Sequence, residues 1–536
     1  MTTQIKYKVN RRILSIALVG LLMVCSSCLM FVYDPLQLIL RKILTLTPGT
    51  VLFNMWSAPP YDVVMKLFIF NITNAEKFMS GEEKLNVTEV GPYSYKEILT
   101  NNNATFADDG TVTYTPRREF IQDPENSVGD PKVARLTVPN IPLLGIQAYL
   151  QDSSFVTNIG FSTVAAGVGA QSIVDLTVDQ YMWGYEDKLV KVANQFLPSW
   201  IDFKTFGILE RLMSRDNSNR VTITVDPSKR KSRFGDLLTE DEQQAQFHIV
   251  SWNGLSGLQQ WGYNPMEEYQ RTNTTKKCQL VEGAYDGTIF PKNLNKNFTI
   301  NLFRKAFCRP VQLQFIEETI SKQGFHAFSY KMREDSFASP EENPDNECYC
   351  HKGVCPGKGL QTIAPCYYDM PITLSQPHFL NADPKIFDTI NGLSPDASKH
   401  ESIAKVQPVL GIPVDESTLK IQVNLAIGKT KFNSQTRPFN NLNLPLFWIE
   451  LTCKEVPPLA YYLITLCVTV LPVAQEVLMY LLLLVGLAMI SGAALLTLFF
   501  SKTVVPRSLS IAADYAPIPL ISIPTQYLKA DIRLCK

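Results

Sequence analysis

The pattern of apolar positions divides the chain into two long apolar runs, one near each end, and a long mixed section between them. Residues 13–33 are 21 residues without a formal charge, and residues 477–500 are 24 such residues. About 20 apolar residues in a helix, at 1.5 Å per residue, cross a hydrocarbon core of roughly 30 Å. We therefore predict two transmembrane helices, over residues 13–33 and 477–500.

A cleaved signal peptide is the alternative for the first run, because four basic residues precede it. The run is longer than the usual 7–15 apolar residues of a signal peptide, which favours an uncleaved anchor. Basic residues lie between each apolar run and the nearer end of the chain. By the positive-inside rule they place residues 1–12 and 501–536 in the cytosol. Residues 34–476 would then be an exoplasmic or luminal ectodomain.

Two further observations bear on this topology. A third apolar run, residues 459–471, lies between prolines and is too short to span. It predicts a buried or membrane-proximal helix. Five N-x-S/T sequons all lie within the ectodomain, as glycosylation requires. The predicted glycosylation sites are Asn71, Asn86, Asn103, Asn273 and Asn297.

The ectodomain shows strand-like alternation of apolar and polar residues in several short runs bounded by Gly, Pro and Asn. The predicted strands include residues 65–73, 111–120, 220–225 and 418–427. Residues 146–197 are instead small and apolar with few prolines, which predicts a helical section, and helices are also expected around residues 311–321. The sequence therefore predicts a mixed, β-rich ectodomain with a helical cap, held by two membrane anchors.

Composition and motifs exclude several classes of function. The formal net charge is zero, so nothing points to nucleic acid as a partner. The five histidines are scattered along the chain, and no metalloprotease, nucleophile-elbow or dinucleotide-binding motif is found. We expect neither an enzyme nor a cofactor.

Eleven cysteines divide by predicted location. Two lie in the first span and one in the C-terminal tail, and eight lie in the ectodomain: Cys278, Cys308, Cys348, Cys350, Cys355, Cys366, Cys453 and Cys467. Cys348, Cys350, His351 and Cys355 are close enough to share a metal ion, but the paired CxxC spacing of zinc sites is missing. An oxidising compartment favours disulfides. Spacing cannot choose the pairs, since six cysteines allow fifteen connectivities.

A series of ordered motifs resembles the class B scavenger receptor family. That family includes the fatty-acid translocase scavenger receptor, a lysosomal integral membrane protein and insect sensory neuron membrane proteins. The most specific match is SFASPEENPDNECYC at residues 336–350. The other matches are FNITN (70–74), EVGPYSYKE (89–97), SVGDPK (127–132), WGYED (183–187), SWNG (251–254), YDGTIFP (285–291), PHFLNAD (377–383) and QVNLAI (422–427).

The resemblance implies features that spacing does not show. It implies an antiparallel β-barrel ectodomain with a helical bundle at its membrane-distal apex, here about residues 146–197, and an apolar tunnel that passes lipid toward the bilayer. It implies the disulfides Cys278–Cys348, Cys308–Cys366 and Cys350–Cys355 within a disulfide-rich region, residues 278–366. Cys453 and Cys467 fall outside this set and either pair with each other or stay free.

The apex departs from family members that capture anionic ligands with basic residues. Residues 141–187 contain no Lys or Arg, but they contain five acids: Asp152, Asp175, Asp179, Glu186 and Asp187. Like charges would repel an anionic particle, unless these acids only cap or solvate helices. A neutral lipid, a sterol or a protein partner is therefore the expected apex ligand.

The C-terminal tail contains a Y-x-x-Φ sequence, Tyr515 to Ile518, of the form that cytosolic adaptor proteins read. Ala488 and Gly492 form a small-xxx-small pair that either brings helices together, as in a homo-oligomer, or faces lipid. The leading interpretation is a receptor of the plasma membrane or the endosomal or lysosomal membrane that binds lipid or lipoprotein and transfers lipid. The alternatives are a lysosomal sorting receptor for a luminal hydrolase and a coreceptor that hands an apolar signal molecule to a channel.

Overall fold

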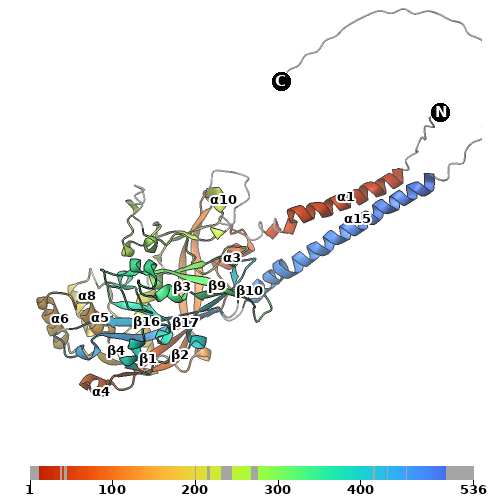
Figure 1. Ribbon diagram of the computed structural model, residues 1–536. Helices are drawn as coiled ribbons and strands as arrows, with labels where there is room; N and C mark the ends of the chain where they lie inside the picture. Colours follow the sequence, from red (N-terminus) through yellow and green to blue (C-terminus); the bar gives the residue numbers. More distant parts are fainter. Residues whose placement is uncertain are drawn as a thin grey trace, which may run out of the picture. The chain divides into compact units, whose positions relative to one another are not determined.

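The computed structural model (Figure 1) describes residues 11–36, 39–40, 45–199, 201–213, 218–230, 244–266, 276–414, 417–430, 432–453 and 456–501. The chain forms two compact units. The first consists of residues 1–35 and 473–536, and the second of residues 36–472.

The first unit contains two long helices that run side by side, α1 (Arg11–Tyr33) and α15 (Leu471–Ser501) (Figure 1). Each belongs to a helical stretch that is long and apolar enough to cross a membrane. The Ser27 hydroxyl donates a hydrogen bond to the Met479 carbonyl oxygen at 2.9 Å. A Cβ atom on Gly20 would lie 2.8 Å from the Gly486 carbonyl oxygen, so the helices touch where neither has a side chain. By contrast, Ala488 is exposed.

Substitution of Gly20 should separate these helices. Gly20→Leu places a side chain where even a Cβ atom is too close to Gly486, and overpacking of this kind costs about 1–3 kcal/mol. We expect a lower yield of oxidative cross-link between cysteines introduced at Ser27 and Met479, with the native Cys25 and Cys28 replaced. Gly492→Leu is the control, because a Cβ atom there meets nothing within 4 Å. Equal yields for the two variants would contradict the glycine contact.

The second unit is built on one 15-stranded sheet, with strand order β7-β6-β3-β2-β1-β17-β16-β14-β10-β9-β8 along its main path. The strands of this path are β1 (Val63–Ile72), β2 (Leu85–Phe106), β3 (Thr111–Gln122), β6 (Val221–Thr224), β7 (Ile249–Trp252), β8 (Ile300–Arg304), β9 (Arg309–Ile320), β10 (His326–Met332), β14 (Ile403–Gln407), β16 (Thr418–Ile427) and β17 (Leu442–Cys453). The short strands beside it are β11 (Gln361–Thr362), β12 (Ile372–Ser375), β13 (Ile390–Asn391) and β15 (Ile412–Pro413). All these pairs are antiparallel except β13 with β2.

The four predicted strands are all present, as β1, β3, β6 and β16. Their alternation reflects a sheet with one face in the core: Met65, Leu67 and Ile69 of β1 are fully buried. The helix expected around residues 311–321 is wrong, because this segment is β9. Val311, Leu313 and Phe315 recur at a spacing of two, and β9 is paired on both sides, with β8 and β10.

The closed barrel implied by the family resemblance is not found as a continuous ladder. Within the described residues β7 and β8 are not paired, so the structure shows a large antiparallel sheet. A short segment lies between these two edges. The Ile249 amide donates to the Ala284 carbonyl oxygen at 2.7 Å, and the Tyr285 amide donates to the Asn301 carbonyl oxygen at 2.7 Å.

The helical cap lies at one end of the sheet (Figure 1). It consists of α5 (Ile141–Tyr149), α6 (Phe155–Gly167), α7 (Val178–Trp183) and α8 (Lys188–Phe196) with the two-stranded sheet of β4 (Arg135–Pro139) and β5 (Ile173–Thr177). The prediction of one helical section over residues 146–197 was therefore wrong at two points. The first helix begins at Ile141, where Asn140 caps it by accepting from the Leu143 amide, and the β-branched run in β5 forms a strand.

Shorter helices connect the strands. The α-helices are α3 (Val51–Ser57), α4 (Ala75–Ser80), α9 (Ile208–Met213), α10 (Pro227–Arg230), α13 (Ala397–His400) and α14 (Pro458–Ile464), followed by the π-helix η12 (Thr465–Val470). The 3-10 helices are η1 (Pro124–Asn126), η3 (Gln259–Trp261), η4 (Lys277–Gln279), η5 (Lys305–Phe307), η6 (Glu334–Phe337), η7 (Pro344–Tyr349), η8 (Ala364–Cys366), η9 (Pro377–Phe379), η10 (Pro384–Asp388) and η11 (Arg437–Phe439). The third apolar run thus lies mainly in α14 and η12, where Ala460, Ile464 and Cys467 are buried as predicted.

Candidate functional site

An apolar cavity of about 170 Å³ lies among eight strands of the large sheet. Side chains from β1, β2, β8, β9, β14, β15, β16 and β17 line it, together with loop residues. Its apolar lining includes Pro59, Val63, Leu99, Phe290, Leu302, Leu313, Val406, Leu419 and Leu451. A cavity with such walls holds a hydrocarbon chain at little cost, since each CH₂ taken from water contributes roughly 0.8 kcal/mol.

Charged side chains line both this cavity and a second one of about 40 Å³. Glu97, Arg304 and Leu451 line both. The Arg118 Nε atom donates to Glu97 Oε1 at 2.8 Å, and Arg304 Nη1 lies 3.8 Å from the same oxygen. The side chains of Glu97 and Arg118 are only 5% and 11% exposed, so solvent has little access to this ion pair. The interior of the sheet therefore contains an apolar cavity whose wall includes a charged cluster.

Tyr114 and Asp286 add a second polar pair to the smaller cavity. The Tyr114 hydroxyl donates to Asp286 Oδ2 at 2.6 Å. Burial, reinforced by the Asp286 carboxylate, raises the pKa of Tyr114 well above its ordinary value, so the hydroxyl stays protonated. The other oxygen, Asp286 Oδ1, accepts from the Thr288 amide at 2.9 Å. This pair is a fixed, satisfied element of the wall.

One helix of the cap, α6, presents an uncharged, partly apolar surface. Helix α6 contains no Asp, Glu, Lys or Arg. Its side chains Phe155 and Val156 are 62% and 77% exposed, and the Phe155 ring meets Phe432 edge-on with centroids 4.9 Å apart. Ile159 and Val164 are also exposed. Exposed apolar patches of this kind mark interaction sites.

The five acids of the cap differ in their surroundings. Asp187 is buried at the N-terminus of α8, where Oδ1 accepts from the Leu189 and Val190 amides. Asp179 is half-buried, whereas Asp152, Asp175 and Glu186 are exposed. Asp175 also accepts a hydrogen bond from the Thr137 hydroxyl at 2.6 Å. One of the five acids therefore caps a helix, and three lie at the surface of the cap.

Comparison with known proteins identifies the family. The sequence profile of the CD36 family matches residues 17–497. The chain belongs to the CD36 family. Scavenger receptor class B member 1 of Sus scrofa is 28% identical over 439 residues, which are 81% of this chain and 79% of the relative. Lysosome membrane protein 2 of Homo sapiens is 28% identical over 413 residues, which are 77% of this chain and 79% of the relative.

Membership in the CD36 family agrees with the resemblance stated from the motifs, and the names of these relatives describe a scavenger receptor and a lysosome membrane protein. Within the described residues the structure contains no group of three or more His, Cys, Asp or Glu side chains placed to hold a metal ion.

The structure contains the three disulfides that the CD36-family resemblance implies. The Cα atoms are 5.8 Å apart in Cys278–Cys348, 6.0 Å in Cys308–Cys366 and 4.3 Å in Cys350–Cys355. His351 Nε2 lies 3.1 Å from Asp369 Oδ1. Cys467 is a buried free thiol, so a Cys453–Cys467 bridge is not formed.

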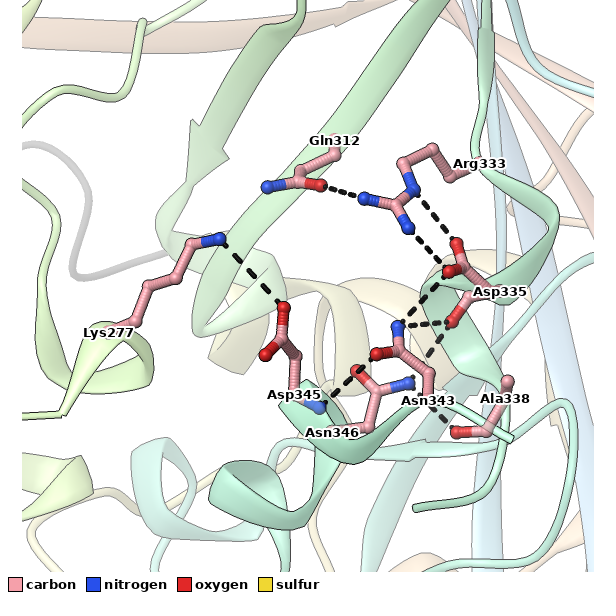
Figure 2. A network of polar contacts seen from close by, with 8 residues as sticks. All are labelled: Lys277, Gln312, Arg333, Asp335, Ala338, Asn343, Asp345 and Asn346. Carbon is pink, nitrogen blue, oxygen red and sulfur yellow. Dashed lines mark hydrogen bonds and ion pairs between the residues drawn. The ribbon is translucent and has the colours of Figure 1, made fainter. Parts of the chain in front are cut away.

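The most specific family motif, residues 336–350, builds a surface pocket of about 510 Å³ beside Cys278–Cys348. Figure 2 shows why its polar residues are needed for the local fold. Arg333 forms an ion pair with Asp335 and donates to Gln312 Oε1 at 2.8 Å. The Asn346 amide donates to the carbonyl oxygens of Asp335 and Ala338, at 3.1 and 2.8 Å. The motif is thus a hydrogen-bonded scaffold for the disulfide region.

The predicted modification and sorting sites differ in accessibility. Asn103 and Asn297 are exposed, whereas Asn71 and Asn86 are half-buried. Asn273 of the sequons, and Tyr515 and Ile518 of the adaptor sequence, lie outside the described residues. All seven remain predictions.

Two of the five histidines meet in the structure, which no motif of the sequence indicated. His378 and His400 are buried and stack with ring centroids 4.6 Å apart, at the edge of a surface pocket of about 890 Å³. His378 Nε2 hydrogen-bonds Glu89 Oε2 at 2.6 Å, and the Trp448 indole donates to the same oxygen at 2.7 Å. Burial alone would raise the pKa of Glu89, but these hydrogen bonds hold it below its usual value.

Backbone amides bond to the Nδ1 atoms of both rings. The Ser394 amide donates to His378 Nδ1 at 3.1 Å, and the Asp396 amide donates to His400 Nδ1 at 3.0 Å. An Nδ1 atom that accepts an amide hydrogen carries no proton, so protonation of His400 at Nδ1 must break its bond to Asp396. Only the position of β2 beside this loop brings Glu89 within reach, which no local sequence signal reveals.

His400 should make stability fall in mild acid. Burial and then the adjacent His378 lower the pKa of His400 to about 4, although Glu89 and Asp396 raise it and Lys420 lowers it further. The unfolded chain takes up this proton near pH 6.5 and the folded chain near pH 4. Stability present above pH 6.5 is therefore lost as the pH falls between these values, by roughly 1–2 kcal/mol after solvent screening.

The measurement is the free energy of unfolding of the full chain at pH 7.5 and pH 4.5, for the parent and for His400→Gln. The variant should lose less stability between the two pH values. His326→Gln is the control, since that histidine is half exposed beside Glu318. An unchanged pH dependence in His400→Gln would contradict the assignment.

Proposed function

We propose that the protein is a scavenger-receptor-like membrane glycoprotein that binds lipid or lipoprotein at the cap and passes lipid through the ectodomain to the membrane. The observation that carries the proposal is the apolar cavity among β1, β2, β8, β9, β14, β15, β16 and β17. CD36-family membership and the name of the relative scavenger receptor class B member 1 support it. Lipid transfer of this kind needs an apolar path and no cofactor.

The cap supports a neutral ligand. Phe155 and Val156 expose apolar side chains on a helix without charge, and no Lys or Arg lies in residues 141–187. Such a surface contacts a neutral lipid, a sterol or the apolar shell of a lipoprotein. The nearest cations of the cap are the exposed Lys188 and Lys191 of α8, outside this neutral helix. The proposed topology has both tails in the cytosol, with the protein at the plasma membrane or an endosomal or lysosomal membrane.

The test blocks the cavity. Ala404 lines it, so Ala404→Trp should fill it and lower the uptake of labelled sterol ester or fatty acid several-fold in cells that display the protein. Ala107→Trp is the control, since Ala107 is exposed in the turn between β2 and β3. Binding of lipoprotein at the surface should stay unchanged in both variants. Uptake by Ala404→Trp equal to that of the parent would show that the cavity is not the path.

A lysosomal sorting receptor is the second candidate. It is favoured by the relative named lysosome membrane protein 2 and by the exposed apolar side chains of α6, which also suit a luminal protein partner. Adaptor proteins would then read Tyr515 to Ile518. Tyr515→Ala should move such a receptor to the cell surface, and unchanged localisation would count against sorting through this sequence.

A further inference from the structure

Residues 458–470 form a helix with two apolar faces, of which only one is buried. The buried face consists of Ala460, Ile464 and Cys467, which are at most 3% exposed. These side chains belong to the same core cluster as Leu52 and Trp56 of α3. This face explains why α14 and η12 are part of the ectodomain.

The other face is also apolar, but it is open. Leu459, Tyr462, Leu466 and Val470 are 58%, 69%, 46% and 49% exposed. Their spacing of three, four and four residues keeps them on one side of the helix, and we call these four residues the exposed stripe. Single exposed apolar residues need no explanation, but four in a row on one helix face mark a contact surface.

Charge and length indicate what covers the exposed stripe. Residues 456–475 contain no charged residue. Helical residues continue from Pro458 to Phe499, which is 42 residues. At 1.5 Å per residue this is about 63 Å, roughly twice the thickness of a hydrocarbon core. The chain therefore carries more apolar helix than one crossing uses, and the surplus contains the exposed stripe.

We propose that the exposed stripe inserts into the exoplasmic leaflet of the membrane, so that α14 and η12 lie on the bilayer as an interfacial helix. Its apolar side chains contact acyl chains, and the Tyr462 hydroxyl reaches the headgroup layer, where tyrosines are enriched. The π turn of η12 and Pro472 are points at which a helix can bend between the bilayer surface and the crossing direction.

A second copy of the chain is the rival occupant. A stable protein interface buries about 800 Å² on each partner, far more than four side chains provide. The covalent continuity with an apolar membrane helix favours lipid. The inference concerns how the ectodomain meets the bilayer, and it holds or fails independently of lipid transfer through the cavity.

The experiment is photolabelling of the full chain in nanodiscs of phosphatidylcholine that carries a diazirine near the middle of one acyl chain. Adducts are mapped by mass spectrometry. We expect adducts on residues 458–470 at a yield about tenfold above three exposed apolar control sites of the ectodomain. These controls are Val133, Ile320 and Val354, which are 70–73% exposed.

Leu459→Asn with Leu466→Asn should lower the adduct yield on residues 458–470 several-fold and leave the yield on residues 477–499 unchanged. Ile320→Asn is the matched control, and the thermal midpoint of each variant reports folding. Labelling of residues 477–499 without labelling of the exposed stripe would overturn the proposal. So would cross-links between two differently tagged copies at these residues in place of lipid adducts.

Discussion

Glu97→Gln should destabilise the second unit by about 3 kcal/mol, because it removes a buried carboxylate that two partly buried guanidinium groups share. Arg118 Nε lies 2.8 Å from Glu97 Oε1, and Arg304 Nη1 lies 3.8 Å from it. The side chain of Glu97 is 5% exposed, so water cannot replace the lost charge. The measurement is the free energy of unfolding from urea titration of the purified chain.

Glu119→Gln is the matched control on the neighbouring strand. Its partner Arg117 lies 2.8 Å away, but the two side chains are 53% and 58% exposed, and such pairs contribute at most about 1 kcal/mol. Equal losses in the two variants would mean that water reaches Glu97. Glu97→Gln also adds a net positive charge to the cavity wall, so transfer of a neutral lipid should be slower even where the variant is folded.

Loss of the Cys308–Cys366 disulfide should cost about 4 kcal/mol, because the unfolded chain gains the freedom of a loop with a sequence separation of 58. Both cysteines are replaced by alanine, so that no free thiol is left to exchange. We expect a large fall in thermal midpoint and in the yield of folded protein at the cell surface. The measurement is calorimetry of the purified variant, with disulfide mapping of the remaining pairs.

The Cys350–Cys355 disulfide provides the comparison. Its sequence separation is only 5, for which the same chain-entropy relation gives about 2 kcal/mol. The double alanine variant at Cys350 and Cys355 should therefore fold. Its thermal midpoint should lie between those of the parent and of the double alanine variant at Cys308 and Cys366. If the short bridge proves equally costly, contacts inside the loop rather than chain entropy determine the effect. The contact of His351 with the Asp369 carboxylate is the first such contact to examine.

The local sequence was sufficient to predict those helices and strands whose pattern of apolar and polar positions is regular along the chain. The two apolar helices follow from uninterrupted hydrophobic composition, and β16 matches residues 418–427 because a half-buried strand imposes a period of two. The helix expected around residues 311–321 was wrong because a short apolar run with Glu317 and Glu318 fits a helix as well as a strand. Pairing with β8 and β10, which no local window contains, makes it a strand.

The candidate site depended on the tertiary structure. Glu97 and Arg304 are more than 200 residues apart and meet only because β2 and β8 face the same interior, and Glu89 meets His378 across 289 residues. The roles of the cap acids were also undecided until Asp187 was seen to cap α8.

The sequence by itself therefore determined the two long apolar helices, the β-rich class, the family and, through the family, the disulfide pairs. Only the tertiary structure decided which charges are buried together, which apolar residues enclose a cavity and which remain exposed. The physical reason is that helices, spans and strands respond to near neighbours along the chain. Burial and electrostatics depend on the register of strands that the chain brings together from far apart.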